Sequence, residues 1–128
     1  MKAALTSGII TSKLAASRDF YTGILGFKVV YESDWFLLLS TADGGQHISF
    51  LQPDHPSQQP VFQPAFTGKG VYLTLEVENV DAEWDRIQQL DVPVLINLRS
   101  EDWGDRHFAL LDPNGIGVDI VTYQAPAS

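Results

Sequence analysis

The chain has 128 residues, the size of one ordinary domain and too short for two independently folding domains of usual size. Its hydrophobic fraction of 45% and charged fraction of 19% are typical of a globular protein and exclude disorder for the bulk of the chain. Sixteen acidic against eight basic residues give a net charge of -8, which argues against nucleic acid and anionic lipid as partners and weakly favours cationic ligands.

The first half of the chain predicts the element order βαβββ. Ser12 is expected to cap a helix, and Gly26 is expected to end it in the left-handed conformation that glycine adopts easily. A tight turn is predicted at residues 43–45, between the last two strands. The expected elements are a strand over 4–11, a helix over 14–25 and strands over 27–32, 35–41 and 47–51.

Four of the seven prolines fall within residues 52–70, which are therefore predicted to form a linker. The order βαβββ then repeats at a shift of 65 or 66 residues. Asn79 or Asp81 is expected to cap the second helix. The expected elements are a strand over 71–77, a helix ending near 90 and strands over 94–98, 106–111 and 117–123.

These patterns predict an α+β fold in which two βαβββ modules form a curled mixed sheet around a cup-shaped cavity. We expect a single domain over residues 1–128, with a first module at about 1–51, the proline-rich linker at 52–70 and a second module at about 71–128. Each sheet would bury its helix-covered face, and the other faces would line the cup. The cup is where we expect the functional site.

Cysteine is absent, which excludes disulfides, thiolate nucleophiles and cysteine-ligated zinc. Neither a signal-peptide pattern nor a run of about 20 apolar residues suited to a membrane helix is recognisable. We therefore expect a cytoplasmic protein that binds neither membranes nor nucleic acid.

Three stretches resemble the vicinal oxygen chelate superfamily, which includes glyoxalase I, extradiol dioxygenases, fosfomycin-modifying enzymes and bleomycin resistance proteins. Residues 14–27, with Phe20-Tyr21 and the closing Leu25-Gly26-Phe27, are similar to the first helix of that family. Residues 76–81 resemble the start of its second module, and residues 103–115 resemble its closing hairpin. Together the three stretches cover nearly the whole chain in the family's order.

The resemblance implies which positions would hold a divalent metal if the chain followed the family's enzymes. They are Thr6, Ser49 or its same-face neighbour His47, Tyr72 and Asp119. Asp119 is a good ligand, and His47 could join it, but Thr6 and Tyr72 are poor ligands for a divalent ion. We therefore expect no cofactor, with a divalent metal held by His47 and Asp119 as the alternative.

Aromatic and polar residues are expected in the cup instead. We predict ligand-binding roles for Trp35, Ser49, Tyr72, Trp103 and Asp119, because ring faces and a carboxylate attract planar and cationic molecules. A carboxylate at Asp119, between Val118 and Ile120, must find a partner or a cavity, and we favour the cavity.

His107 is a weak catalytic candidate, since imidazole titrates near neutral pH. A hydrogen bond within the sheet is the plainer role for it.

Two functions follow from this resemblance and these residues. The leading hypothesis is a metal-free homodimer that binds an aromatic or cationic small molecule and confers antibiotic resistance by sequestration, as the resemblance to bleomycin resistance proteins implies. The alternative is a divalent-metal-dependent lyase, isomerase or dioxygenase with His107 as its base.

Overall fold

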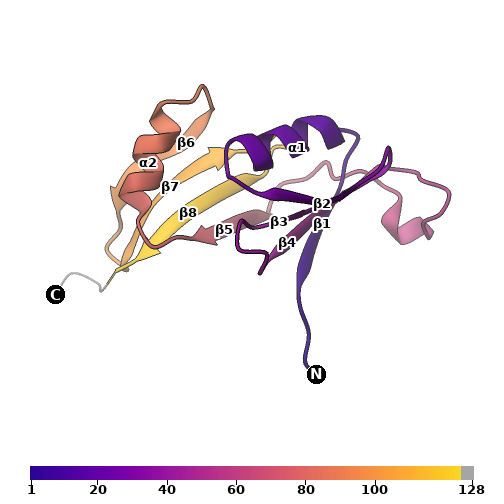
Figure 1. Ribbon diagram of the computed structural model, residues 1–128, viewed down its shortest axis with the longest axis horizontal. Coiled ribbons are helices and arrows are strands. Elements are labelled where there is room, and N and C mark those ends of the chain that lie inside the picture. Colours follow the sequence, from indigo (N-terminus) through magenta and orange to yellow (C-terminus); the bar gives the residue numbers. More distant parts are fainter. Residues whose placement is uncertain (125–128) are drawn as a thin grey trace. The chain divides into compact units, whose positions relative to one another are not determined.

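The computed structural model describes residues 1–124 and divides into two compact units, Met1–Thr67 and Gly68–Ser128. Each unit contains a strand, a helix and three further strands, which confirms the predicted α+β fold of two βαβββ modules (Figure 1). The cup-shaped cavity stays a prediction. No helix among residues 1–124 has both the length and the apolar character needed to cross a membrane.

The first unit is built on a four-stranded mixed sheet in the order β1-β4-β3-β2. Strand β1 runs parallel to β4, and the other neighbours are antiparallel. Its elements are β1 (Thr6–Ile10), α1 (Leu14–Gly23), β2 (Lys28–Glu32), β3 (Phe36–Ser40) and β4 (His47–Leu51).

The core of the first unit lies between α1 and one face of this sheet. Tyr21 of α1 is 1% exposed, and its ring lies 5.3 Å from that of Phe50 on β4. Alternation along the strands sends Phe50, Leu37 and Leu39 to this face, where all three are buried. Burial of these side chains is the main stabilising contribution to the unit.

The start of α1 differs from the prediction that Ser12 caps it. Lys13 is the cap residue, its side chain makes no capping hydrogen bond, and its backbone N–H donates to the Thr11 hydroxyl at 3.0 Å. The predicted left-handed glycine is confirmed, since Gly26 has a φ of 75°. The next residue, Phe27, donates its backbone N–H to the Tyr21 carbonyl and returns the chain to the sheet.

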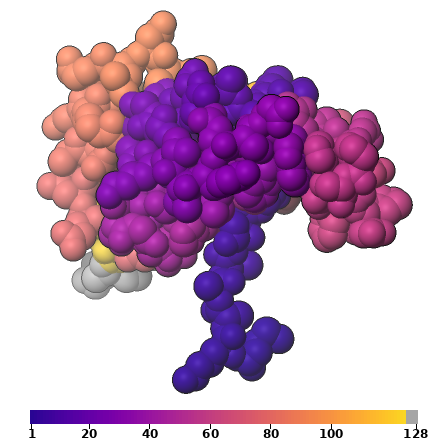
Figure 2. Space-filling view, turned by 45° about the vertical axis from the view of Figure 1, so that its right-hand side comes forward, coloured from indigo at the N-terminus to yellow at the C-terminus, as the bar shows by residue number. Residues whose placement is uncertain are grey.

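The proline-rich segment is folded onto the first unit. It contains the 3-10 helix η1 (Pro60–Phe62), and the Phe66 backbone N–H donates to the Ile10 carbonyl at the end of β1. In Figure 2 this segment forms the magenta lobe of the surface, and the first residues, in indigo, project from the same unit.

The second unit repeats the topology with the strand order β5-β8-β7-β6. Its elements are β5 (Tyr72–Glu76), α2 (Val80–Gln88), β6 (Val94–Ser100), β7 (Asp105–Leu111) and β8 (Gly117–Tyr123). Asn79 caps α2, because its side chain accepts a hydrogen bond from the Ala82 backbone N–H at 3.1 Å.

The core of the second unit lies between α2 and one face of the sheet. The Trp84 ring lies 5.1 Å from that of Phe108, which is fully buried on β7. Trp84 is thus a packing residue of α2, as Phe20, which is 7% exposed, is of α1. A bidentate pair between Arg106 and Asp81 also joins β7 to the start of α2.

Candidate functional site

The site is built on the face of the second sheet that α2 does not cover, which we call the helix-free face. Phe108, Val118 and Ile120 face α2, so their strand neighbours point the other way. The register places Thr74 and Ala109 on either side of Asp119. The strand residues of this face are Tyr72, Thr74, Glu76, Asp105, His107, Ala109, Leu111, Gly117, Asp119, Val121 and Tyr123.

Four side chains at this face form a row of alternating charge, which we call the charge chain. Asp119 Oδ1 lies 2.6 Å from His107 Nδ1, and Glu101 Oε2 lies 2.9 Å from His107 Nε2. The other oxygen of the Glu101 carboxylate, Oε1, lies 3.0 Å from Nη2 of Arg99. The order is therefore Arg99, Glu101, His107 and Asp119.

The fold explains why these residues meet. His107 lies two residues before Ala109, the register partner of Asp119, so the two side chains are diagonal neighbours on one face. Arg99 lies opposite His107 across the hairpin of β6 and β7. Glu101 begins the turn of that hairpin and donates its backbone N–H to the Asp105 carbonyl at 2.7 Å.

The geometry favours the doubly protonated form of His107. Each ring nitrogen faces a carboxylate, and only the imidazolium can donate to both. Burial would lower the pKa of His107, but the hydrogen bonds to Glu101 and Asp119 outweigh burial and raise this pKa above its ordinary 6.5. The hydrogen bond from His107, supported by the charge of Arg99, lowers the pKa of Glu101.

Asp119 is held at one oxygen only. Within residues 1–124 its second carboxylate oxygen has no hydrogen-bond partner, and 25% of the side chain is exposed. Asp119 therefore has a partner, His107, where we favoured a cavity. Both ring nitrogens of His107 are directed at carboxylates, so the ring orients Asp119 and has no nitrogen left to face a substrate.

Two predicted ligand contacts of the second unit have large exposed rings. Tyr72 lies on the helix-free face beside Gly117 and is 72% exposed. Trp103 lies in the turn between β6 and β7 and is 66% exposed. Their ligand-binding roles, like that of Asp119, stay predictions.

Sequence reasoning missed Arg99 and Glu101. Both residues lie beyond residue 98, where the sixth strand was expected to end. In the structure β6 continues to Ser100, so it includes Arg99 and brings Glu101 to the start of the turn. The available signal was their spacing of two residues, which places side chains on one side of an extended chain. Their approach to His107 depends on the hairpin register, which the sequence pattern did not specify.

The candidate residues of the first unit lie on a different sheet. Ser49 of β4 lies between Gly8 and Leu38, and a Cβ atom added at Gly8 would lie only 3.2 Å from Ser49 Oγ. His47 is half-buried on the same strand beside Thr6 and Ser40. The register partners of Ser49 are therefore uncharged.

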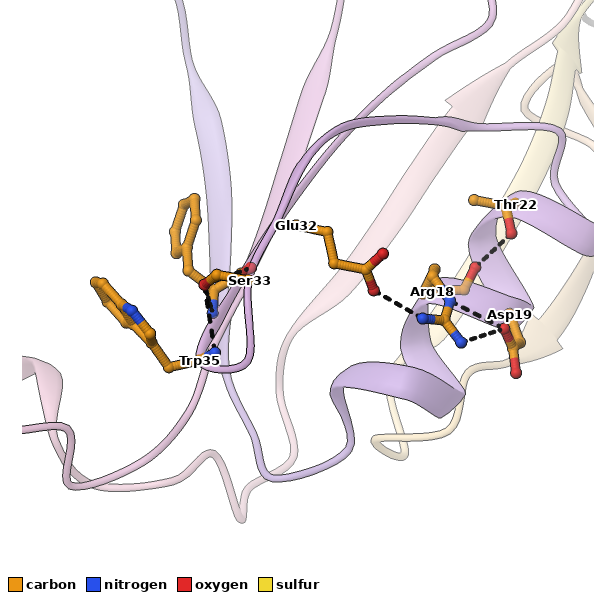
Figure 3. Close-up of polar contacts among 7 residues, drawn as sticks. Arg18, Asp19, Thr22, Glu32, Ser33 and Trp35 are labelled. Atoms are coloured by element: carbon orange, nitrogen blue, oxygen red, sulfur yellow. Dashed lines mark hydrogen bonds and ion pairs between the residues drawn. The ribbon is translucent and has the colours of Figure 1, made fainter.

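Trp35 is fixed by two features of the first unit. Ser33 Oγ accepts hydrogen bonds from the backbone N–H groups of Trp35 and Phe36 (Figure 3). The indole is stacked on the imidazole of His55, with ring centroids 4.0 Å apart and planes at 14°. This stack occupies one face of the Trp35 ring.

A divalent metal held by His47 and Asp119, which belong to different units, stays the alternative. Across residues 1–124, no group of three or more His, Cys, Asp or Glu side chains is arranged to hold a metal ion. In the charge chain, His107 is placed between two carboxylates, and its ring nitrogens point at those carboxylates in opposite directions.

Comparison with known protein families identifies one superfamily. The model described as Glyoxalase/Bleomycin resistance protein/Dioxygenase superfamily matches residues 4–120. None of the curated proteins matches the chain in sequence.

Solved structures share the fold at low sequence identity. TnmS3, an antibiotic binding protein from Streptomyces sp. CB03234, has a TM-score of 0.73 and 19% identity, over 97% of this chain and 98% of its own. Lactoylglutathione lyase from Agrobacterium tumefaciens has a TM-score of 0.76 and 19% identity, over 95% of this chain and 94% of its own. A glyoxalase/bleomycin resistance protein/dioxygenase from Nocardioides has a TM-score of 0.77 and 16% identity, over 100% of this chain and 89% of its own.

Proposed function

Since the chain belongs to the Glyoxalase/Bleomycin resistance protein/Dioxygenase superfamily, as its resemblance to the vicinal oxygen chelate proteins predicts, we propose that it is a metal-free small-molecule-binding protein. Its ligand is a planar aromatic or cationic molecule, and sequestration of an antibiotic is the most specific form of this function. The fold alone does not distinguish a binder from an enzyme, so the argument rests on the side chains.

One observation carries the proposal: the His107 imidazole is hydrogen-bonded to a carboxylate at each ring nitrogen. A metal ligand or a general base must present a nitrogen lone pair to the ion or to the substrate. Here both nitrogens are engaged, so His107 suits neither role. The arrangement supports recognition, in which a fixed carboxylate and exposed rings contact the ligand.

Two further findings support binding. Tyr72 and Trp103 expose ring faces in the second unit, and such faces attract planar rings and cations, with contributions on the order of 1 kcal/mol per contact. TnmS3, which shares the fold, is an antibiotic binding protein. Trp35 and Ser49 of the first unit stay predicted contacts of the same ligand.

Titration with a panel of planar aromatic antibiotics, followed by tryptophan emission, tests the function. We expect saturable quenching in the native protein and a much smaller change in Trp103→Phe. Trp84→Phe is the matched control, because Trp84 packs on Phe108 in the core and should leave the quenching unchanged. Unchanged emission of the native protein across the panel would contradict the proposal.

Elemental analysis of untagged protein separates binding from the metal-dependent alternative. We expect no stoichiometric iron, manganese, nickel or zinc. One equivalent of such a metal, lost in Asp119→Ala, would replace our proposal with a lyase, isomerase or dioxygenase.

The homodimer also stays a prediction. Light scattering at micromolar concentration checks it, since a monomeric mass would contradict it.

A further inference from the structure

We propose that Asp119 selects ligands that carry a cationic nitrogen, and that His107 is a positioning residue that holds the selecting carboxylate in place. This inference rests on the proposed function and narrows its ligand from aromatic or cationic molecules to cations. The argument uses only contacts within the second unit.

The first step is the state of the Asp119 carboxylate. Its Oδ1 is fixed by His107 Nδ1 at 2.6 Å, while its Oδ2 has no partner within residues 1–124. A carboxylate oxygen only accepts hydrogen bonds, so a donor or a positive charge is the complement that it requires. Thr74 and Ala109, the register partners of Asp119, have small side chains, and 25% of the Asp119 side chain is exposed.

The second step is the rigidity of the anchor. His107 is held on its other side by Glu101 at 2.9 Å, and Glu101 is held by Arg99 at 3.0 Å. Each contact joins opposite charges, so rotation of Asp119 would break a chain that extends across three strands. A pre-positioned carboxylate binds a cation without first losing side-chain freedom.

The third step is the balance of charge around the anchor. The charged side chains of the helix-free face and the charge chain are Glu76, Glu101, Asp105 and Asp119 against Arg99 and His107. Four negative groups face two positive ones even when His107 is protonated, and both positive groups are already paired. An anionic ligand would therefore meet an unfavourable field, and a cation a favourable one.

The exposed rings complete the chemical class. Tyr72 is two residues from Thr74 on the same face and presents its ring to solvent. A ring face and a carboxylate together favour a cationic nitrogen attached to a flat, apolar body. A planar heteroaromatic cation, or an aromatic amine that is protonated at neutral pH, fits both features.

Three dyes of related size test the charge preference. Thioflavin T has a fixed positive charge, its analogue without the N-methyl group is neutral, and anilinonaphthalene sulfonate is an anion. We expect thioflavin T to bind native protein about five- to tenfold more tightly than the neutral analogue, and the anion to bind most weakly. Equal binding of the charged and neutral dyes would overturn the charge preference and leave the proposed function standing, whereas binding of none of the three would overturn both.

Two carboxamide variants locate the preference. Asp119→Asn should reduce the affinity for thioflavin T roughly five- to tenfold and leave that for the neutral analogue within about twofold. Glu76→Gln is the matched control, because it removes the same charge from the same face at a residue outside the charge chain. Equal losses in the two variants would show a diffuse charge effect and would overturn the role of Asp119.

Two substitutions of His107 test its positioning role. The amide nitrogen of Asn occupies about the place of His Nδ1, and that of Gln about the place of Nε2. His107→Asn should therefore keep a donor for Asp119 and retain the preference for thioflavin T, whereas His107→Gln should lose it. Both variants are compared at equal fractions folded, measured by circular dichroism. Loss in both, or in neither, would overturn the positioning role.

Discussion

The two modules share a topology and differ in the chemistry of one face. In the first, Ser49 lies between Gly8 and Leu38, and Phe36 is its diagonal neighbour. At the matching positions of the second, Asp119 lies between Thr74 and Ala109, with His107 as its diagonal neighbour. The sheet is thus specified by the apolar face beneath the helix, while the other face accepts either an apolar or an ionic set of side chains.

The ion pairs that join helix and sheet also differ between the modules, in which element supplies the cation and which the anion. In the first unit Arg18 of α1 contacts Glu32 of β2 at 2.7 Å (Figure 3), whereas in the second the helix supplies Asp81 and the strand supplies Arg106. The side chains of these pairs are partly exposed, and ion pairs near the surface contribute little to stability. Their reversal supports the view that buried apolar contacts, rather than charges, specify the repeat.

The largest effect is therefore expected from the cores. Phe50→Ala and Phe108→Ala each remove a fully buried ring that packs on an aromatic side chain of the helix. Each should lower the free energy of unfolding by about 3–5 kcal/mol, measured by urea denaturation. A loss below about 1 kcal/mol in one variant alone would show that the two helix-to-sheet contacts are not equivalent.

The next effect comes from giving the second module the side chains of the first. His107→Phe should cost about 1–3 kcal/mol, because it leaves the Asp119 carboxylate without a donor and Glu101 with Arg99 alone. Adding Asp119→Ser should recover part of the loss, since an unpaired carboxylate is then replaced by a small hydroxyl. Urea denaturation of the four proteins of this double-mutant cycle measures the coupling. Additive losses would mean that the contact between His107 and Asp119 contributes nothing to stability.

Sequence patterns predicted the shared part of the modules well. The bounds of β4 and β8 agree with the expected 47–51 and 117–123, because turn residues at 43–45 and 112–115 precede each strand. Within the strand expected over 71–77, Leu73 and Leu75 are half-buried, whereas Tyr72 and Thr74 on the other face of β5 are exposed. Apolar alternation is a local property, and a local pattern is enough to predict it.

The part that differs between the modules was harder to predict. The charge chain depends on the register of the hairpin between β6 and β7, which has irregularities near Ile96, so Glu101 was not recognised as a partner of His107. Asp119 was recognised as a residue that needs a partner or a cavity, but the choice between them needs three-dimensional positions. The helix caps were predicted only in part. Asn79, one of two candidates, caps α2, whereas Ser12 was wrongly predicted to cap α1.

The caps provide a smaller and more local comparison. Asn79→Ala removes the side chain that accepts the Ala82 N–H, and should cost about 1 kcal/mol. Ser12→Ala should change stability by less than about 0.5 kcal/mol, because Ser12 is exposed and is not the cap residue of α1. Thermal unfolding of both variants checks the difference. A loss in Ser12→Ala as large as that in Asn79→Ala would contradict the assignment of the first cap.

The smallest effect is the pH dependence that His107 gives to the stability of the second module. The pKa of His107 is raised above 6.5, so its contribution to stability is complete below about pH 6.5 and is lost as the pH rises through the pKa in the folded protein. The pKa of Glu101 is lowered below 4.5, so its contribution is complete above about pH 4.5 and is lost as the pH falls. The stability difference between native protein and His107→Phe should therefore be greatest between about pH 4.5 and 6.5 and decline on either side. Melting temperatures measured across pH 4 to 9 test this window, with His47→Phe, at a half-buried position on β4, as the control. A difference that keeps increasing above pH 6.5 would mean that the folded protein stabilises the neutral imidazole, and that His107 does not donate to both carboxylates.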